Sequence, residues 1–289
     1  MWSLYKKELS VYFKTPMGYI FLALILFFTG TIFTLSFLFR GNQNFSAYLQ
    51  VLTSLFAIIS PLLTMRLYSD EFKHRTDQLL FCLPLRTIDI VLAKLFAVLT
   101  IFSVILLNLL LYLSIIFAFG NPDWAHIASA FIGFILLGTT LLSIGSAFSS
   151  YTQHQLLAAM LSFICIVAII VLSSIAPILP LNSGISWFVL LFMLAIASGL
   201  FYAKTHQKRY SIAIFLIGFA LLSTMYLYNH AYFYALIPRL LRSLSPLARY
   251  QSFNHGIINI SDLYYFIMVI TVLQYLIYIN LEKHYYKEK

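Results

Sequence analysis

The stretch VLAKLFAVLTIFSVILLNLLLYLSIIFA, residues 91–118, decides the class of fold. Lys94 is its only charged residue, and the run is apolar on all sides. An α-helix needs about 20 residues to cross the roughly 30 Å of hydrocarbon in a bilayer. A transmembrane β-strand would instead alternate polar and apolar residues over about 10 positions. The stretch therefore predicts a membrane-spanning helix.

Comparable apolar runs recur along the whole chain. The 289 residues are 62% hydrophobic and 9% charged, whereas soluble domains average about 25% charged residues. We therefore expect an all-α integral membrane protein that forms a single transmembrane domain over residues 1–289. The predicted spans are eight, at about 17–39, 46–67, 91–118, 125–148, 155–178, 186–203, 211–228 and 263–281. The alternative count is six, because the runs 186–203 and 211–228 are shorter than average.

The distribution of Lys and Arg predicts which segments face the cytoplasm, because basic loops stay on that side of the membrane. With the N-terminus inside, the inner segments are 1–16, 68–90, 149–154, 204–210 and 282–289. Together with the span ends they hold fourteen Lys and Arg residues, against four in the outer segments. Both termini are thus expected to be cytoplasmic. This bias, together with attraction of basic residues to anionic lipid, explains the net charge of +9. A nucleic-acid partner is not needed to explain it.

Residues 1–16 are expected to form an interfacial helix on the inner leaflet. One face would carry Trp2, Tyr5, Leu9 and Tyr12 or Phe13, and the opposite face Lys6, Lys7, Ser10 and Lys14. This arrangement serves either as a plain membrane anchor or as an elbow that moves with the first span.

Motifs for catalysis are absent from the sequence. There is no P-loop, no H-E-x-x-H and no G-x-S-x-G. No Asp or Glu lies inside a predicted span, which counts against an ion-coupled carrier, although backbone carbonyls can also bind sodium. The two cysteines, Cys82 and Cys165, form neither a disulfide pattern nor a metal pattern. We therefore expect no enzyme activity, no metal and no cofactor in this chain, and any energy would come from a partner.

The stretch DEFKHRTDQLLFCLPLR, residues 70–86, concentrates charge in this apolar chain. Nine charged residues lie between Arg66 and Lys94, whereas the whole chain has 18 Lys and Arg and 9 Asp and Glu. We expect a short amphipathic helix here, with Ser69 or Asp70 as its cap, Phe72, Leu79, Leu80 and Leu83 as its apolar stripe, and Pro84 as its end. Mixed charge beside an apolar stripe suits docking into a protein groove. A solvated hairpin that only links two spans fits the same residues equally well.

Three stretches of the chain resemble ABC-2-type transporter permeases. RLYSDEFKHRTDQLLFCLPLRTIDIVLAK, residues 66–94, resembles the loop between the second and third spans of that family. KKELSVYFKTPMGYIFLALILFFTG, residues 6–30, is similar to its amphipathic elbow and first span. LSPLARYQSFNHGIINISDLYYF, residues 244–266, resembles the outer segment and the start of the last span in permeases of gliding motility and nitrous-oxide-reductase maturation. The departures from the family pattern are Arg75 and Ala93, where Gly is common, and Gln78, where Glu is common.

The resemblance implies the permease subunit of an ABC exporter in the bacterial cytoplasmic membrane. A second permease copy or a related permease would complete the path, and a separate cytosolic ATPase would bind ATP and magnesium. The loop 68–90 would hold a coupling helix that sits in a cleft of that ATPase. The coupling residues so implied are Asp70, Glu71, Lys73, Arg75, Thr76, Asp77, Gln78, Leu79, Leu80 and Pro84. The alternative function is an integral membrane scaffold or regulator that recruits a cytosolic protein without transport.

Three further features have two interpretations each. The turn 149–155 offers Tyr151 and His154 as a second contact with the ATPase, or is a simple turn. Small residues on the fourth span (Gly138, Gly145 and Ser149) predict close helix packing within one subunit rather than a dimer seam. The extracytoplasmic segment 229–262 is expected to form short helices at the outer surface. Its aromatic residues and Arg239, Arg242 and Arg249 either anchor the segment at the membrane interface or meet an anionic substrate.

The eight-span count can be tested at the turn between the sixth and seventh predicted spans. A cysteine in place of His206 should be protected from an impermeant thiol reagent applied outside, because the basic turn KTHQKRY is expected to be cytoplasmic. Labelling of this cysteine from outside would contradict the eight-span count.

Overall fold

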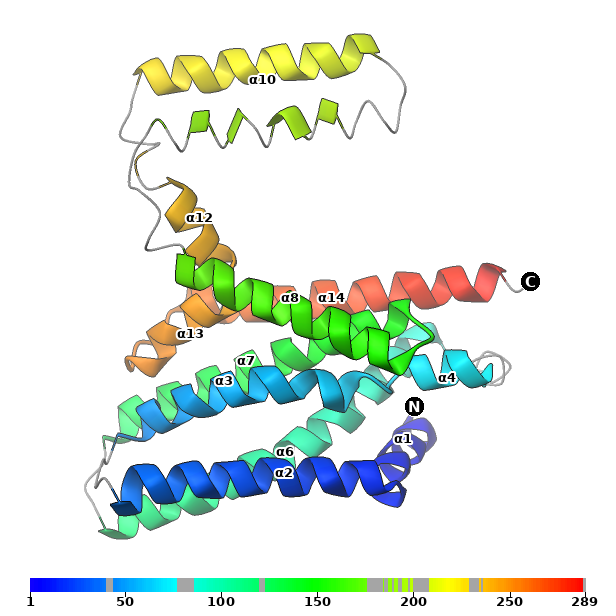
Figure 1. Ribbon diagram of the computed structural model, residues 1–289, viewed down its shortest axis with the longest axis vertical. Coiled ribbons are helices and arrows are strands. Elements are labelled where there is room, and N and C mark those ends of the chain that lie inside the picture. Colours follow the sequence, from blue (N-terminus) through cyan, green and yellow to red (C-terminus); the bar gives the residue numbers. More distant parts are fainter. Residues whose placement is uncertain are drawn as a thin grey trace. The chain divides into compact units, whose positions relative to one another are not determined.

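The computed structural model describes residues 1–39, 44–76, 86–119, 123–175, 208–228 and 236–287, together with Tyr234 and short pieces between residues 184 and 199. Every regular element in these ranges is a helix, so the all-α fold class is confirmed for them (Figure 1). The elements are α1 Trp2–Lys14, α2 Pro16–Phe33, the π-helix η1 Thr34–Phe39, α3 Phe45–Thr64, α4 Ser69–His74, α6 Thr87–Phe119, α7 Trp124–Tyr151, α8 Gln155–Ile175, α10 Lys208–Tyr228, α12 Leu236–Leu244, α13 Pro246–Asn254 and α14 Ile260–Lys287.

Six helical stretches of the described residues are long and apolar enough to cross a membrane. They are Gly18–Phe37, Phe45–His74, Thr87–Phe119, Trp124–Tyr151, Gln155–Ile175 and Ile260–His284. Each coincides with a predicted span, and together they are the helices of a multi-pass membrane protein. The predicted span 186–203 lies mostly outside the described residues. The predicted span 211–228 is helical in α10, but its described apolar part, Phe215–Tyr226, is short. The count of eight therefore stays a prediction.

The chain divides into two compact units. The first unit comprises Met1–Ile169 and Pro246–Lys289, and the second comprises Ile170–Ser245. In the first unit α3, α13 and α14 pack against α7, and α1 packs against α6. In the second unit the ring of Trp187 lies 5.6 Å from that of Tyr226 on α10, between ring centroids.

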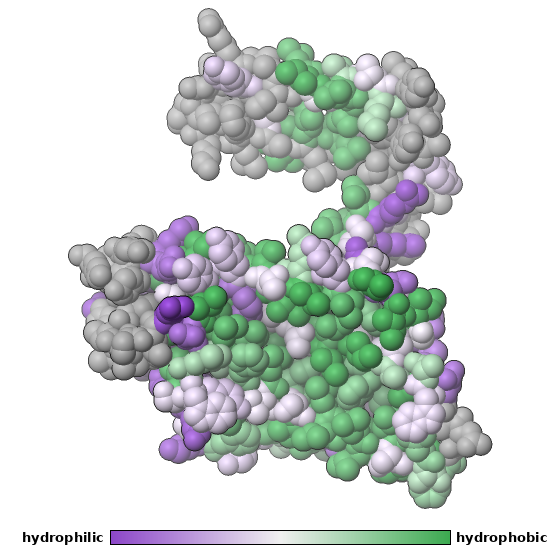
Figure 2. All heavy atoms as spheres, turned by 180° about the vertical axis from the view of Figure 1, so that it is seen from behind, coloured by the Kyte–Doolittle hydropathy of each residue, from purple (hydrophilic) through white to green (hydrophobic). Residues whose placement is uncertain are grey.

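The core of the first unit is built from aromatic and aliphatic side chains of α3, α6 and α7. Three buried phenylalanines meet there, with ring centroids 5.0 Å apart for Phe56 and Phe102 and 5.9 Å apart for Phe102 and Phe134. Outside this core the surface is also largely apolar, as the green area over the spanning helices in Figure 2 shows. An apolar exterior around an apolar core is the pattern expected of a helix bundle in lipid.

Small residues on α7 allow its close packing, as predicted from the sequence. A Cβ added to Gly138 would lie 2.4 Å from the ring of Phe102 on α6, and one added to Gly145 would lie 2.0 Å from Oγ1 of Thr64 on α3. Both contacts are within this chain, so the prediction of packing inside one subunit is confirmed at these two glycines.

Four stretches predicted to be cytoplasmic lie at one end of the first unit. Side-chain contacts join α1, the segment after α3, the start of α8 and the C-terminal part of α14, all of which meet at the same end in Figure 1. The contacts are Lys7 with Glu71 at 3.4 Å, Arg66 with Gln155 at 3.1 Å, Phe72 with His284 at 4.8 Å between ring centroids, and Asn280 with the carbonyl of Ser150. These four segments, of the five predicted to be cytoplasmic, therefore share one end of the first unit, whichever side of the membrane that end faces.

The segment 229–262 contains the short helices that the sequence predicted, α12 and α13. On α13, Arg249 Nη1 pairs with Asp262 Oδ1 of α14 at 2.7 Å, and its guanidinium lies 4.3 Å from the ring centroid of Tyr265. Arg249 thus joins α13 to the start of α14.

Substituting Gly145 tests the packing of α7. We expect Gly145→Ala to reduce the free energy of unfolding by about 1–3 kcal/mol, the usual cost of overpacking a core, because buried, β-branched Thr64 cannot easily move away. The measurement is unfolding in mixed detergent and SDS, followed by circular dichroism. Gly30→Ala is the control, since its Cβ would meet only the Tyr112 hydroxyl, at 3.2 Å. Equal stability of the two variants would contradict the packing.

Candidate functional site

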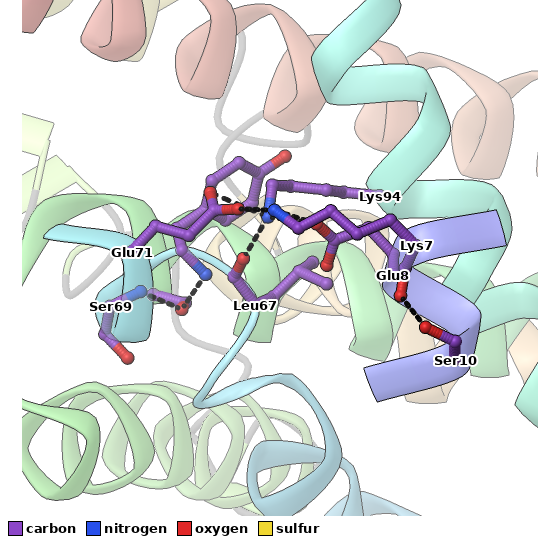
Figure 3. A network of polar contacts seen from close by, with 9 residues as sticks. Lys7, Glu8, Ser10, Leu67, Ser69, Glu71 and Lys94 are labelled. Carbon is purple, nitrogen blue, oxygen red and sulfur yellow. Dashed lines mark hydrogen bonds and ion pairs between the residues drawn. The ribbon is translucent and has the colours of Figure 1, made fainter. Parts of the chain in front are cut away.

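A buried lysine holds three helices together at the basic end of the first unit. The Nζ of Lys94 on α6 lies 2.8 Å from Oε2 of Glu71 on α4 and 3.2 Å from Oε1 of Glu8 on α1. It also donates a 2.6 Å hydrogen bond to the carbonyl of Leu67, in the turn between α3 and α4. All three ammonium protons can thus be used. We call Glu8, Glu71 and Lys94 the ion-pair junction (Figure 3).

The junction is buried, so its charges must balance inside the protein. Lys94 is 0% exposed and Glu8 is 6% exposed. Removing an ion from water costs several kcal/mol unless partners compensate it. Two carboxylates around one ammonium leave a negative charge, which Lys7 offsets from 3.4 Å at Glu71 Oε1 and 3.8 Å at Glu8 Oε1. Because the Lys7 side chain is half exposed, it contributes less than the buried pairs do.

A serine on α7 satisfies the backbone where α3 ends and α4 begins. The hydroxyl of Ser149 accepts hydrogen bonds from the backbone N–H groups of Tyr68 and Ser69, at 3.1 and 3.3 Å, and donates to the carbonyl of Met65 at 3.0 Å. The first N–H groups of a helix have no partner within it. Ser149 supplies that partner for α4 and fixes the direction in which α4 leaves α3.

Gln155 at the start of α8 links two further charged side chains of this region. Its Oε1 accepts from Nε of Arg66 at 3.1 Å, and its Nε2 donates to Oδ1 of Asp70. The predicted second contact residues, Tyr151 and His154, precede Gln155 and are exposed. The structure therefore places this turn beside α4, as a shared surface would require.

Helix α4 is shorter than the sequence predicted. It ends at His74, whereas we expected a helix that runs on to Pro84. The backbone N–H of Thr76 bonds to the carbonyl of Glu71 at 3.0 Å, and that of Arg75 to the carbonyl of Phe72 at 3.4 Å. These two bonds form a Schellman motif, which requires a left-handed residue at the position after the cap. Arg75 takes that conformation, with φ of 54°.

The implied coupling residues fall into four groups. Glu71 points inward to Lys94, whereas Lys73 and Arg75 are exposed. Asp70 and Thr76 are partly exposed beside them. Outside the described residues lie Asp77, Gln78, Leu79, Leu80 and Pro84. Of the expected apolar stripe, Phe72 is buried and stacks on His284 of α14, so it serves this chain's own packing.

The sequence-based reasoning missed Glu8. It is the only acidic residue among the first 69, and it shares the buried face of α1 with Leu4, which packs on Ile90 and Ala93 of α6. Of the predicted apolar face, Trp2 and Phe13 are exposed, whereas Tyr5, Leu9 and Tyr12 are partly buried. The isolated acidic residue one turn from a leucine was the signal available, but it does not reveal that the partner is Lys94. Helix α1 exists as predicted, and its action as an elbow stays a proposal.

Tyr12 connects α1 to the end of α3. Its hydroxyl donates a 3.0 Å hydrogen bond to the carbonyl of Leu63. Burial raises the pKa of Tyr12 well above its usual value, and the nearby Glu8 carboxylate raises it further, while Arg66 lowers it. The phenol therefore stays protonated and remains a donor at any physiological pH.

The same helices enclose a cavity of about 270 Å³ beside the junction. Its polar walls include Lys7, Glu8 and Arg66, and its apolar walls include Val11 and Leu62. Among the residues that the structure describes, no group of three or more His, Cys, Asp and Glu side chains could hold a metal ion. The cavity therefore offers charged and apolar walls to a bound group.

Comparisons with known proteins do not assign the chain to a family. No protein-family model matches the chain, and no curated protein matches it. The similarity to ABC-2-type permeases therefore depends on the three sequence stretches and enters the function as a proposal.

Replacing the central lysine tests the junction. We expect Lys94→Met to lower the free energy of unfolding by about 3–5 kcal/mol, because it leaves the Glu8 and Glu71 carboxylates with only the half-exposed Lys7 as a counter-ion. Lys73→Met, at an exposed position on α4, should change little. Adding Glu8→Gln and Glu71→Gln to Lys94→Met should recover much of the loss. Unfolding in mixed detergent and SDS measures all three, and a Lys94→Met protein as stable as Lys73→Met would show that the junction is not structural.

Proposed function

We propose that this chain is the transmembrane permease subunit of an ABC exporter. It forms the translocation path with a second permease copy or a related permease, and a separate cytosolic ATPase supplies the energy. ATP and magnesium bind to that ATPase, and this chain has no catalytic role. The basic end of the first unit faces the cytoplasm, with both termini there, and the chain spans the membrane eight times.

The observation that carries this proposal is the two-sided character of α4. Its inner side is fixed by Glu71 on Lys94 and by Phe72 on His284. Its outer side presents Lys73, His74 and Arg75 to solvent. A short helix that is tied to several spans on one side and charged on the other can receive a force from a soluble protein and pass it to the membrane helices. A loop that merely linked two spans would need neither the ion pairs nor the stacking.

The inner contacts define where such a force would go. A displacement of α4 acts on α1 and α6 through the ion-pair junction, and on α8 through the Asp70–Gln155 hydrogen bond. The contact of Phe72 with His284 adds α14. These connections support coupling between an ATPase contact and several spanning helices at once.

A scaffold that recruits a cytosolic protein could use the same outer surface of α4. The two functions differ in one respect, since a scaffold needs binding alone and an exporter needs binding that changes ATP turnover. A neighbouring reading frame that encodes a P-loop ATPase favours the exporter, and co-expression with that ATPase allows the direct test.

Charge reversal on the outer side of α4 should uncouple the partner. In proteoliposomes with the ATPase from the neighbouring reading frame, we expect Lys73→Glu with Arg75→Glu to weaken ATPase binding at least about tenfold. Hydrogen bonds to charged groups contribute about 1.5–3 kcal/mol each, and about 1.4 kcal/mol corresponds to a factor of ten. ATP hydrolysis stimulated by the permease should fall with binding.

The control is Lys14→Glu with Lys283→Glu, which makes the same change of charge at exposed positions on α1 and α14. Both double variants should unfold at the same SDS fraction as the unmodified chain. If the α4 variant keeps full binding and stimulated hydrolysis, α4 is only a linker. If the unmodified chain binds the ATPase without changing its turnover, the protein is a scaffold.

A further inference from the structure

The cavity beside the ion-pair junction has an unusual mixture of walls. Six charged side chains line it, three of each sign: Lys7, Arg66 and Lys94 against Glu8, Asp70 and Glu71. The rest of the wall is mainly apolar, with Val11, Phe21 and Leu62 from α1, α2 and α3, and it also includes His74 and Thr76. A cavity whose charges cancel does not favour a purely anionic or a purely cationic ligand. It favours a ligand with one group of each sign and an apolar part.

Two of the charged residues still have unused binding atoms. Among the described residues, Arg66 is bonded only through Nε, to Gln155, so Nη1 and Nη2 are available. Glu8 uses Oε1 for Lys94 and Lys7, and its Oε2 has no described partner. The cavity thus offers a fork of N–H donors, which matches phosphate geometry, and a carboxylate oxygen, which accepts N–H donors.

The cavity lies at the level where the spanning helices begin. Gly18 lines it and is also the first residue of the span Gly18–Phe37. Leu62 lines it from the last turns of α3 and is largely exposed. Residues at spacings of three and four share one face of a helix, and Val51, Leu55, Ile58 and Leu62 follow that spacing. An apolar stripe, exposed at Val51, Ile58 and Leu62 and partly buried at Leu55, therefore runs from the cavity along α3 into the membrane-spanning region.

We propose that this cavity binds the headgroup of a phospholipid that carries both a phosphate and a primary ammonium group, the phosphatidylethanolamine class. The phosphate contacts the Nη groups of Arg66 with help from Lys7, and the ammonium donates to Oε2 of Glu8. One acyl chain lies along the apolar stripe of α3. The volume, about 270 Å³, falls just below the roughly 300–1,000 Å³ of sites for whole drug-sized ligands, so the headgroup alone enters.

The headgroup chemistry distinguishes this lipid from its neighbours in the bilayer. Phosphatidylcholine has no N–H donor for Glu8, and phosphatidylglycerol has no ammonium group at all. We expect the purified full chain in mild detergent to bind one dioleoyl-phosphatidylethanolamine by native mass spectrometry, at least tenfold more tightly than either analogue. Only this lipid should raise the melting temperature, by several degrees. Soluble phosphoethanolamine should bind far more weakly, because it lacks the chain along α3.

Two variants test the site by different routes. Arg66→Gln removes the phosphate donors, and Val11→Trp fills the cavity from an exposed position of α1 without touching a charge. Each should lower lipid affinity about tenfold or more. The controls Lys14→Gln and Phe13→Trp, on the same helix but away from the cavity, should keep it. Equal binding of phosphatidylcholine, binding of free phosphoethanolamine as tight as that of the lipid, or normal binding by either test variant would overturn the proposal.

Discussion

The burial of the Lys94 ammonium is the constraint on which the basic end of this protein depends. A buried cation must have partners of opposite charge, and no single helix supplies them here. Glu8 comes from α1 and Glu71 from α4, 86 and 23 residues away in the chain, and the Leu67 carbonyl completes the set. The position of α1 and of the turn after α3 is therefore determined by electrostatics as much as by apolar contact.

This constraint divides the charged loop into two kinds of residue. Glu71 pairs with Lys94 within the chain, whereas Lys73 on the same short helix and Arg75 just after it are open to solvent. Charge density in the sequence indicated one docking surface for the whole loop. In the structure, part of that charge holds the helix in place and part is presented outward. The division is what allows a short helix to be both firmly attached and accessible.

Six spanning helices could be predicted because length and apolarity alone determine them, as at residues 91–118. The gathering of four predicted inner segments at one end of the first unit also agrees with the count of Lys and Arg. The partner of Lys94 and the end of α4 could not be predicted in this way. Glu8 is distant in sequence, and its burial depends on three-dimensional packing. Arg75 adopts a left-handed conformation that costs a non-glycine residue about 1–2 kcal/mol, so local preference gives no warning that the helix ends there.

The junction also has a consequence for the order in which the chain is made. Glu8 leaves the ribosome before Lys94, so the ion pair that docks α1 on α6 cannot form until residue 94 has been synthesised. Only then can Lys94 leave the aqueous interface with a counter-ion on each side. Helix α1 is therefore made before the helix on which it docks, and a chain cut before residue 94 would lack the lysine that pairs with Glu8.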